Sequence, residues 1–172
     1  METSAETKIP FYNVVNIFLP GLTFVGAVLL LFLDKIKTVV TVLSGVGSTG
    51  LEVLVSVSCF AIAYEVGYII FRFGAIAIEP LLKRLFGWTP YEQFVTAKKA
   101  GAKSLDMLSR EYGYARTQIT LFIALAIAAG VSGQWALLGV SIACILLFTL
   151  TARGHIKKIS ITAKKYNETP NN

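Results

Sequence analysis

Residues 117–152, TQITLFIALAIAAGVSGQWALLGVSIACILLFTLTA, lie between Arg116 and Arg153 and contain no charged side chain. One membrane-spanning helix needs about 20 apolar residues, so this run is too long for a single span. Ser132 and Gly133, near its middle, are typical of a break between helices. We therefore predict a tight helical hairpin made of a third span, an external turn and a fourth span, at residues 114–131, 132–134 and 135–152.

Two more long apolar runs precede this hairpin, at residues 11–33 and 51–78. The first contains Pro20, which removes a backbone hydrogen bond and predicts a kink within one span. The composition agrees with a membrane protein, because 55% of the residues are hydrophobic and only 15% are charged, against about a quarter charged in globular domains. The sequence predicts an all-α, polytopic membrane protein with four transmembrane helices.

Residues 79–113, between the second and third spans, are polar and basic. Apolar positions recur there at three- and four-residue steps, with most charges on the opposite side, which is typical of an amphipathic helix. These apolar positions are Phe94, Ala97, Gly101, Leu105, Leu108 and Tyr112. We expect a cytoplasmic amphipathic helix here, available to a cytoplasmic protein partner.

Lysine and arginine are distributed unevenly between the connections. They are frequent in residues 79–113 and 153–172, but residues 34–50 hold only two and the hairpin turn holds none. Because basic segments stay on the cytoplasmic side of a membrane, we predict that the two rich segments are cytoplasmic and that 34–50 is an external loop. Four crossings then place the N-terminal tail, residues 1–10, in the cytoplasm too. The expected location is the bacterial inner membrane.

Glu65 lies near the middle of the second span, where an unpaired charge costs about 2.5–3.5 kcal/mol on insertion scales. Arg72 is seven residues farther along, on the same helical face and about 10 Å away, with Tyr68 between them. Arg116 begins the third span. One interpretation is a proton- or ion-linked site, or a gate, built around Glu65. The other is a buried contact with arginine or tyrosine that fixes helix register or subunit assembly.

Small residues recur on two of the predicted spans, and such faces let helices approach closely. We expect helix-packing roles for six of them: Cys59, Ala63 and Gly67 in the second span, and Ala136, Gly139 and Ala143 in the fourth. The apolar surroundings of both cysteines favour this packing role over redox chemistry.

The basic segments also predict contacts with anionic lipid or with a partner. Five lysines are the candidates: Lys98, Lys99, Lys103, Lys157 and Lys158. Nucleic acid is not an expected partner, since the membrane orientation rule already accounts for the charge. We find no catalytic constellation, no metal-ligand spacing and no cofactor motif, and we expect no enzyme activity.

Three short motifs together resemble a group of largely uncharacterised small bacterial four-span membrane proteins. They are Leu19-Pro20-Gly21, Tyr64-Glu65-Val66-Gly67-Tyr68 and Glu111-Tyr112-Gly113-Tyr114-Ala115-Arg116. Some proteins of that kind are membrane components of anti-phage defence systems, in which a cytoplasmic sensor triggers depolarisation or permeabilisation. The resemblance implies such an effector role.

Three functions remain open at this level. The leading hypothesis is a small homo-oligomeric membrane protein that acts as a channel-like or membrane-perturbing effector, or as the membrane subunit of a larger system. The alternatives are a proton-coupled exporter of small molecules and a passive membrane anchor or scaffold. Glu65 separates them, because only transport or gating requires a carboxylate inside the membrane.

Overall fold

The computed structural model describes residues 11–32, 37, 41, 49–99 and 103–168. The predicted N-terminal tail and most of the predicted external loop lie outside the described residues. Every regular element within them is helical. The elements are α1 (Phe11–Leu31), α3 (Thr49–Phe73), the π-helix η1 (Gly74–Ile78), α4 (Glu79–Phe86), α5 (Tyr91–Lys99), α6 (Lys103–Val131) and α7 (Trp135–Glu168). Four helices are long and apolar enough to cross a membrane, which confirms the all-α prediction with four candidate spans.

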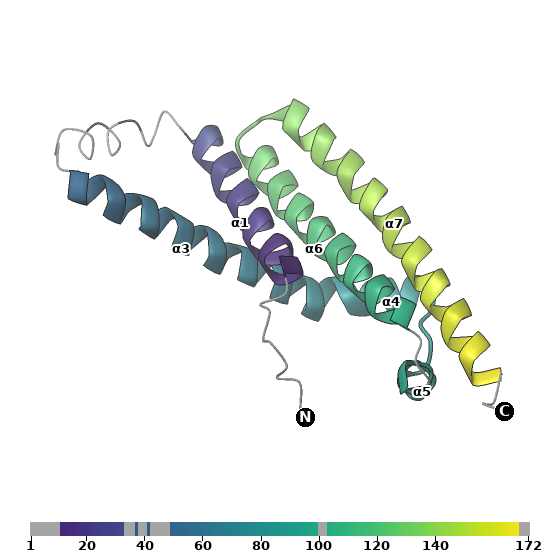
Figure 1. Cartoon of the computed structure of the whole chain (residues 1–172). Helices are drawn as coiled ribbons and strands as arrows, with labels where there is room; N and C mark the ends of the chain where they lie inside the picture. Colours follow the sequence, from purple (N-terminus) through teal and green to yellow (C-terminus); the bar gives the residue numbers. More distant parts are fainter. Residues whose placement is uncertain (1–10, 33–36, 38–40, 42–48, 100–102, 169–172) are drawn as a thin grey trace, which may run out of the picture.

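The ends of the helices lie toward two opposite ends of the structure (Figure 1). The beginning of α1, the helices α4 and α5 and the end of α7 lie at one end, which we call the α5 end. The turn between α6 and α7 lies at the other, together with the end of α1 and the beginning of α3. Helices α6 and α7 run side by side, whereas α3 crosses α1 and diverges from the bundle toward its own beginning.

The turn between α6 and α7 closes through backbone hydrogen bonds. The Gln134 N–H donates to the Ala129 carbonyl at 2.9 Å and the Gly133 N–H to the Gly130 carbonyl at 3.2 Å. This pair of bonds is the Schellman arrangement, which requires a left-handed residue after the helix. Gly133 supplies it with φ 69°, at no steric cost because it has no Cβ.

The second candidate span changes its helical geometry near its end. After α3, residues Gly74–Ile78 form a π-helix, and the Glu79 backbone N–H donates to the Gly74 carbonyl. Pro80, in the first turn of α4, has no backbone N–H to donate, so the α-helical ladder is interrupted there in any case. Short π segments of this kind occur often at functional sites. Here the segment connects α3 to α4, which begins at Glu79.

The main hydrophobic core lies at the α5 end. It joins α4, α5, α6 and α7 through the buried side chains Ile78, Leu82, Ala97, Leu105, Tyr112, Ala115, Ile119, Ala152, Ile156, Ile159 and Ala163. The described members of the amphipathic pattern contribute to it, although the pattern is divided between α5 and the beginning of α6. A smaller cluster of Ile70, Leu121 and Leu125 joins α3 to α6.

The fourth candidate span continues as a helix well past the predicted boundary at residue 152. Helix α7 has 34 residues, or about 51 Å at 1.5 Å per residue, against a hydrocarbon core of about 30 Å. Ala152, Ile156, Ile159 and Ala163 form a buried stripe along its final part. Their three- and four-residue spacing makes the basic C-terminal segment an amphipathic helix packed on the α5 end.

Candidate functional site

Helices α1 and α3 touch through their backbones at a pair of glycines. A Cβ on Gly21 would lie 1.8 Å from the Ala63 carbonyl oxygen, and a Cβ on Gly67 would lie 1.9 Å from the Ile17 carbonyl oxygen. Only glycine fits both positions. The structure thus places Ala63 and Gly67 at the crossing with α1, while Cys59, one turn earlier, is exposed.

Glu65 lies on the opposite side of α3 from this crossing. It is two residues, about 200° of helical rotation, from both Ala63 and Gly67, and it is exposed. Within the described part of the chain it has no hydrogen bond or ion pair. Of the two interpretations of Glu65, a contact with an arginine or tyrosine of the same chain is thus not made among the described residues.

Tyr68 and Arg72 interact with each other instead. The Arg72 Nε donates a hydrogen bond to the Tyr68 hydroxyl at 2.8 Å, and its guanidinium lies 5.0 Å from the centre of the Tyr68 ring. The two residues are one helical turn apart from each other, so this contact is local to α3. Tyr68 and Arg72 thus form a pair on the same face of α3 as Glu65, between Glu65 and the α5 end.

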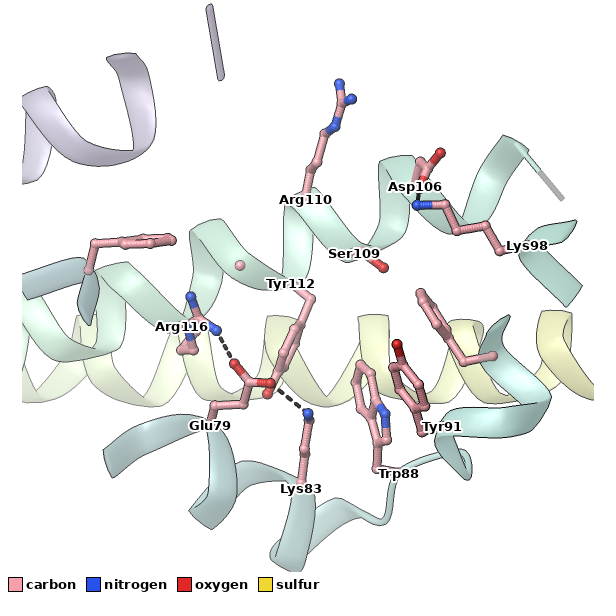
Figure 2. Close-up of a pocket in the computed structure, with 13 residues that line it drawn as sticks. Glu79, Lys83, Trp88, Tyr91, Lys98, Asp106, Ser109, Arg110, Tyr112 and Arg116 are labelled. Atoms are coloured by element: carbon pink, nitrogen blue, oxygen red, sulfur yellow. Dashed lines mark hydrogen bonds and ion pairs between the residues drawn. The ribbon is translucent and has the colours of Figure 1, made fainter. Parts of the chain in front are cut away.

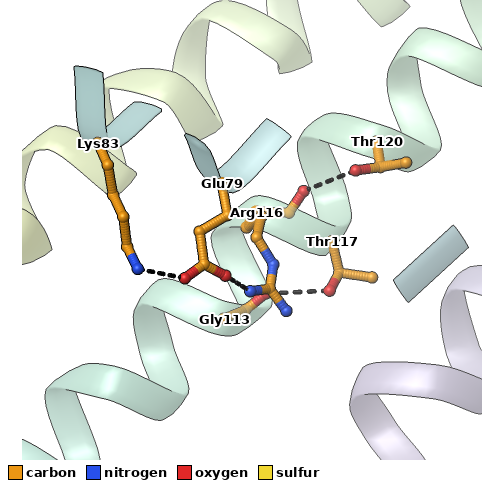
Figure 3. Close-up of polar contacts among 6 residues, drawn as sticks. All are labelled: Glu79, Lys83, Gly113, Arg116, Thr117 and Thr120. Carbon is orange, nitrogen blue, oxygen red and sulfur yellow. Dashed lines mark hydrogen bonds and ion pairs between the residues drawn. The ribbon is translucent and has the colours of Figure 1, made fainter. Parts of the chain in front are cut away.

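Arg116 pairs with Glu79 at the α5 end (Figure 3). Its Nη1 donates to the Glu79 Oε2, and the Lys83 Nζ lies 2.6 Å from the Glu79 Oε1. Arg116 is only 8% exposed, so its charge has left bulk water and needs this carboxylate. Glu79 therefore joins α4 to α6 through Arg116, and Lys83 adds a second cation from α4 itself.

The contact between η1 and α6 brings these groups together. A Cβ on Gly74 would lie 2.7 Å from the Thr120 hydroxyl oxygen, so any larger residue at position 74 would require Thr120 to shift. The Thr120 hydroxyl donates to the Arg116 carbonyl at 3.1 Å, and the Thr117 hydroxyl to the Gly113 carbonyl at 3.0 Å (Figure 3). These buried threonines are satisfied within their own helix, which leaves the Arg116 side chain for Glu79.

A pocket of about 580 Å³ opens beside this ion pair, between α4, α5 and the first half of α6 (Figure 2). Charged and aromatic side chains line it: Phe71, Glu79, Lys83, Trp88, Tyr91, Phe94, Lys98, Asp106, Arg110, Tyr112 and Arg116, together with Ser109 and Gly113. The Lys98 Nζ lies 2.8 Å from the Asp106 Oδ1 across its outer edge. Cavities of this volume are in the range that binds small ligands.

The remaining predicted residues lie on outer surfaces. Ala136, Gly139 and Ala143 are exposed along α7, and a Cβ on Gly139 would meet nothing within 4 Å. Lys98, Lys99, Lys157 and Lys158 are also exposed. Lys103 begins α6, but its side chain lies outside the description. These three small residues of α7 thus lie outside the packed face of the helix, on which Ser141 is buried.

Sequence reasoning missed Glu79 as the partner of Arg116. It also treated Tyr112 as an apolar position and assigned no site role to Ser109 or Lys83. One signal was available, because a connection between adjacent antiparallel spans returns the end of one span to the beginning of the next. Residues that flank those two ends, such as Glu79 and Arg116, are therefore natural neighbours.

Among the described residues, no group of three or more histidine, cysteine, aspartate or glutamate side chains could hold a metal ion. Comparisons of the chain with protein-family models, with curated proteins and with solved structures found no match.

Proposed function

We propose that the chain is the subunit of a homo-oligomeric, channel-like membrane protein in which the Glu65 faces of neighbouring copies meet. The position of Glu65 carries this proposal. It is exposed on the side of α3 that faces away from α1, within a helix long and apolar enough to span a membrane. In an isolated copy inside a bilayer, this carboxyl group would lie against lipid.

Exposed apolar and exposed charged residues have different consequences in a bilayer. Ile62 and Ile69, near Glu65 on the same face, are 54% and 63% exposed, and lipid satisfies both. A carboxylate against lipid costs about 2.5–3.5 kcal/mol on insertion scales, and such residues normally face other helices or a water-filled cavity. Glu65 therefore favours a protein surface or a water-filled path at this face of α3.

A second copy of the chain is the partner that fits this face. Copies inserted in the same orientation carry Glu65 at the same depth, and rotation about a shared axis brings these carboxyl groups into a ring. Rings of charged side chains line the paths of ion channels. Ser58 and Tyr68 lie on the same face on either side of Glu65 and add hydroxyl groups along that path.

The alternative functions explain the residues of this face less well. A proton-coupled exporter of cationic compounds must hold its substrate at the carboxylate, but Arg72 lies about 10 Å away on the same face and would repel it. A passive anchor needs no carboxylate inside the membrane. In a larger system, including an anti-phage system, α4 and α5 would receive the cytoplasmic partner and the Glu65 face would act on the membrane.

The first test compares bacterial cells that express the wild-type chain, Glu65→Gln or Glu92→Gln, using a voltage-sensitive dye. Glu92 is an exposed glutamate of α5, outside the candidate spans, and serves as the matched control. We expect the wild type and Glu92→Gln to depolarise the membrane and Glu65→Gln to do so much less. Equal depolarisation by all three would rule out a path lined by Glu65.

The second test asks directly whether the faces meet. With Cys59 and Cys144 replaced by serine, Ile62→Cys should form disulfide-linked dimers in membranes treated with an oxidant. Leu30→Cys, on an exposed face of α1, is the control and should remain monomeric. A potential unchanged by wild-type expression, combined with no cross-link at position 62, would contradict the proposal and leave an anchor.

A further inference from the structure

We propose that the pocket between α4, α5 and α6 binds the phosphate group of an anionic ligand. This inference is independent of Glu65 and of any channel, because the pocket lies at the α5 end, about 21 Å along the helix from Glu65 to Glu79. Figure 2 shows Ser109 and Tyr112 projecting from α6 toward Trp88 and Tyr91 on the other wall.

Three polar atoms on one face of α6 are buried and have no hydrogen-bond partner among the described residues. They are the Ser109 Oγ, the Tyr112 hydroxyl and the Arg116 Nε. Their spacing of three and four residues places them on one side of the helix, and all three residues line the pocket. Tyr112 is 4% exposed and Arg116 is 8% exposed. Buried polar groups are nearly always hydrogen-bonded, so these three donors indicate a missing acceptor.

The charges of the pocket favour an anion over a cation. Three basic side chains, Lys83, Lys98 and Arg116, face it against two acidic ones, Glu79 and Asp106, whereas the Arg110 side chain projects away from it (Figure 2). Both carboxylates are already paired, Glu79 with Arg116 and Lys83 and Asp106 with Lys98. A cation would have to break one of these pairs. An anion adds negative charge where positive charge is in excess, and it accepts hydrogen bonds from the unpartnered donors.

Phosphate is the anion that matches this donor set. Its several oxygens accept bonds from more than one hydroxyl and from an arginine at once. The volume of about 580 Å³ leaves room for the group that carries the phosphate, and Trp88, Tyr91 and Phe94 offer that group an aromatic wall. The pocket adjoins the ends of the candidate spans, so a phospholipid headgroup and a soluble phosphate compound are both able to supply it.

The test uses Trp88 as a reporter within the full chain. Trp135 is the other tryptophan and is 75% exposed at the far end, so Trp135→Phe leaves a single fluorophore in the pocket. The purified protein in detergent is titrated with short-chain phosphatidylglycerol, with phosphatidylcholine of the same chain length and with inorganic phosphate. We expect saturable fluorescence changes with phosphatidylglycerol or phosphate and at least tenfold weaker binding of phosphatidylcholine.

Tyr112→Phe removes one unpartnered hydroxyl and should weaken binding about fivefold to tenfold, the usual effect of one hydrogen bond. Ser109→Ala is a second, smaller change with the same expected direction. Tyr114→Phe is the matched control, since Tyr114 is on the same helix but its ring packs against Phe148. It should bind as the wild type does.

Each result has a consequence. Saturation by phosphatidylglycerol alone identifies a lipid headgroup, and saturation by inorganic phosphate as well identifies a soluble phosphate compound. Binding that is absent for both, equal for phosphatidylcholine, or unchanged by both Tyr112→Phe and Ser109→Ala would overturn the proposal. Circular dichroism and gel filtration of each variant exclude misfolding as the cause of lost binding.

Discussion

Two glutamates on the same continuous run of helix have opposite surroundings. Glu79, at the α5 end, contacts both Arg116 and Lys83. Glu65, 14 residues earlier, is exposed on a candidate span and has no partner among the described residues. Within its described residues, the chain thus pairs the carboxylate of Glu79 with two cations and leaves the carboxylate of Glu65, in the apolar part of the candidate span, without any.

The same contrast extends to the packing around each glutamate. Half of the residues in the most apolar stretch of α6, the helix that carries Arg116, are buried. In the most apolar stretch of the second candidate span, the fraction is 17%. The main core, the buried ion pair and the pocket all lie at the α5 end. We infer that the α5 end contributes most of the stability of one copy. The outer face of α3 is then available for the contacts with other copies that we propose above. Substitutions at the two regions should therefore affect different measurements.

The largest expected loss of stability comes from Arg116→Ala. Removing one partner of a buried ion pair costs about 3–5 kcal/mol, and we expect a loss near the lower end of that range because Lys83 still contacts Glu79. Unfolding in an SDS titration, followed by circular dichroism, measures this loss. Arg72→Ala is the matched control, because Arg72 is exposed and makes only a local contact with Tyr68. Similar losses for the two variants would remove the distinction between the α5 end and the face of α3.

Gly67→Ala should have the next largest effect. The added Cβ would lie 1.9 Å from the Ile17 carbonyl oxygen, so α1 and α3 must move apart, and overpacking of this kind costs about 1–3 kcal/mol. The same SDS titration measures it. Gly139→Ala, whose Cβ would meet nothing within 4 Å, should leave stability equal or slightly raised, because alanine favours helix more than glycine does. A loss at both positions would show that the loss at Gly67 is not specific to the crossing of α1 and α3, and helix propensity could not cause it because alanine favours helix.

The overall class of fold could be predicted because it depends on local patterns. Apolar runs of sufficient length predict spans, and the residues Val131-Ser132-Gly133-Gln134 predict the turn in which Gly133 adopts its positive φ. The helical continuation of α7 was missed because its basic residues dominated the interpretation. The spacing of Ile156, Ile159 and Ala163, all buried, was the available signal, and it is helical.

The site was predicted less completely, because contacts between distant residues are not encoded in spacing. Glu65, Tyr68 and Arg72 were identified from one helical face, yet which of them interact depended on side-chain reach, and Arg72 contacts Tyr68. The partner of Arg116 depended on how η1 approaches α6 at Gly74. That approach is a tertiary feature, so a sequence without an alignment could name the charges but not pair them.

Asp106→Asn should have the smallest effect on stability, and it should strengthen anion binding in the pocket. Asp106 and Lys98 pair at 2.8 Å, but their side chains are 49% and 54% exposed, so water and salt screen the attraction and its loss costs less than about 1 kcal/mol. The substitution also leaves Lys98 without its carboxylate at the edge of the pocket. Anion binding reported by Trp88 should then become severalfold tighter at low salt, and the gain should shrink as salt is added. Glu92→Gln, an exposed change on the same helix as Lys98, should alter neither measurement. If Asp106→Asn weakened anion binding instead, the pair would be needed to hold α5 against α6, and the stability of the α5 end would extend to its exposed charges.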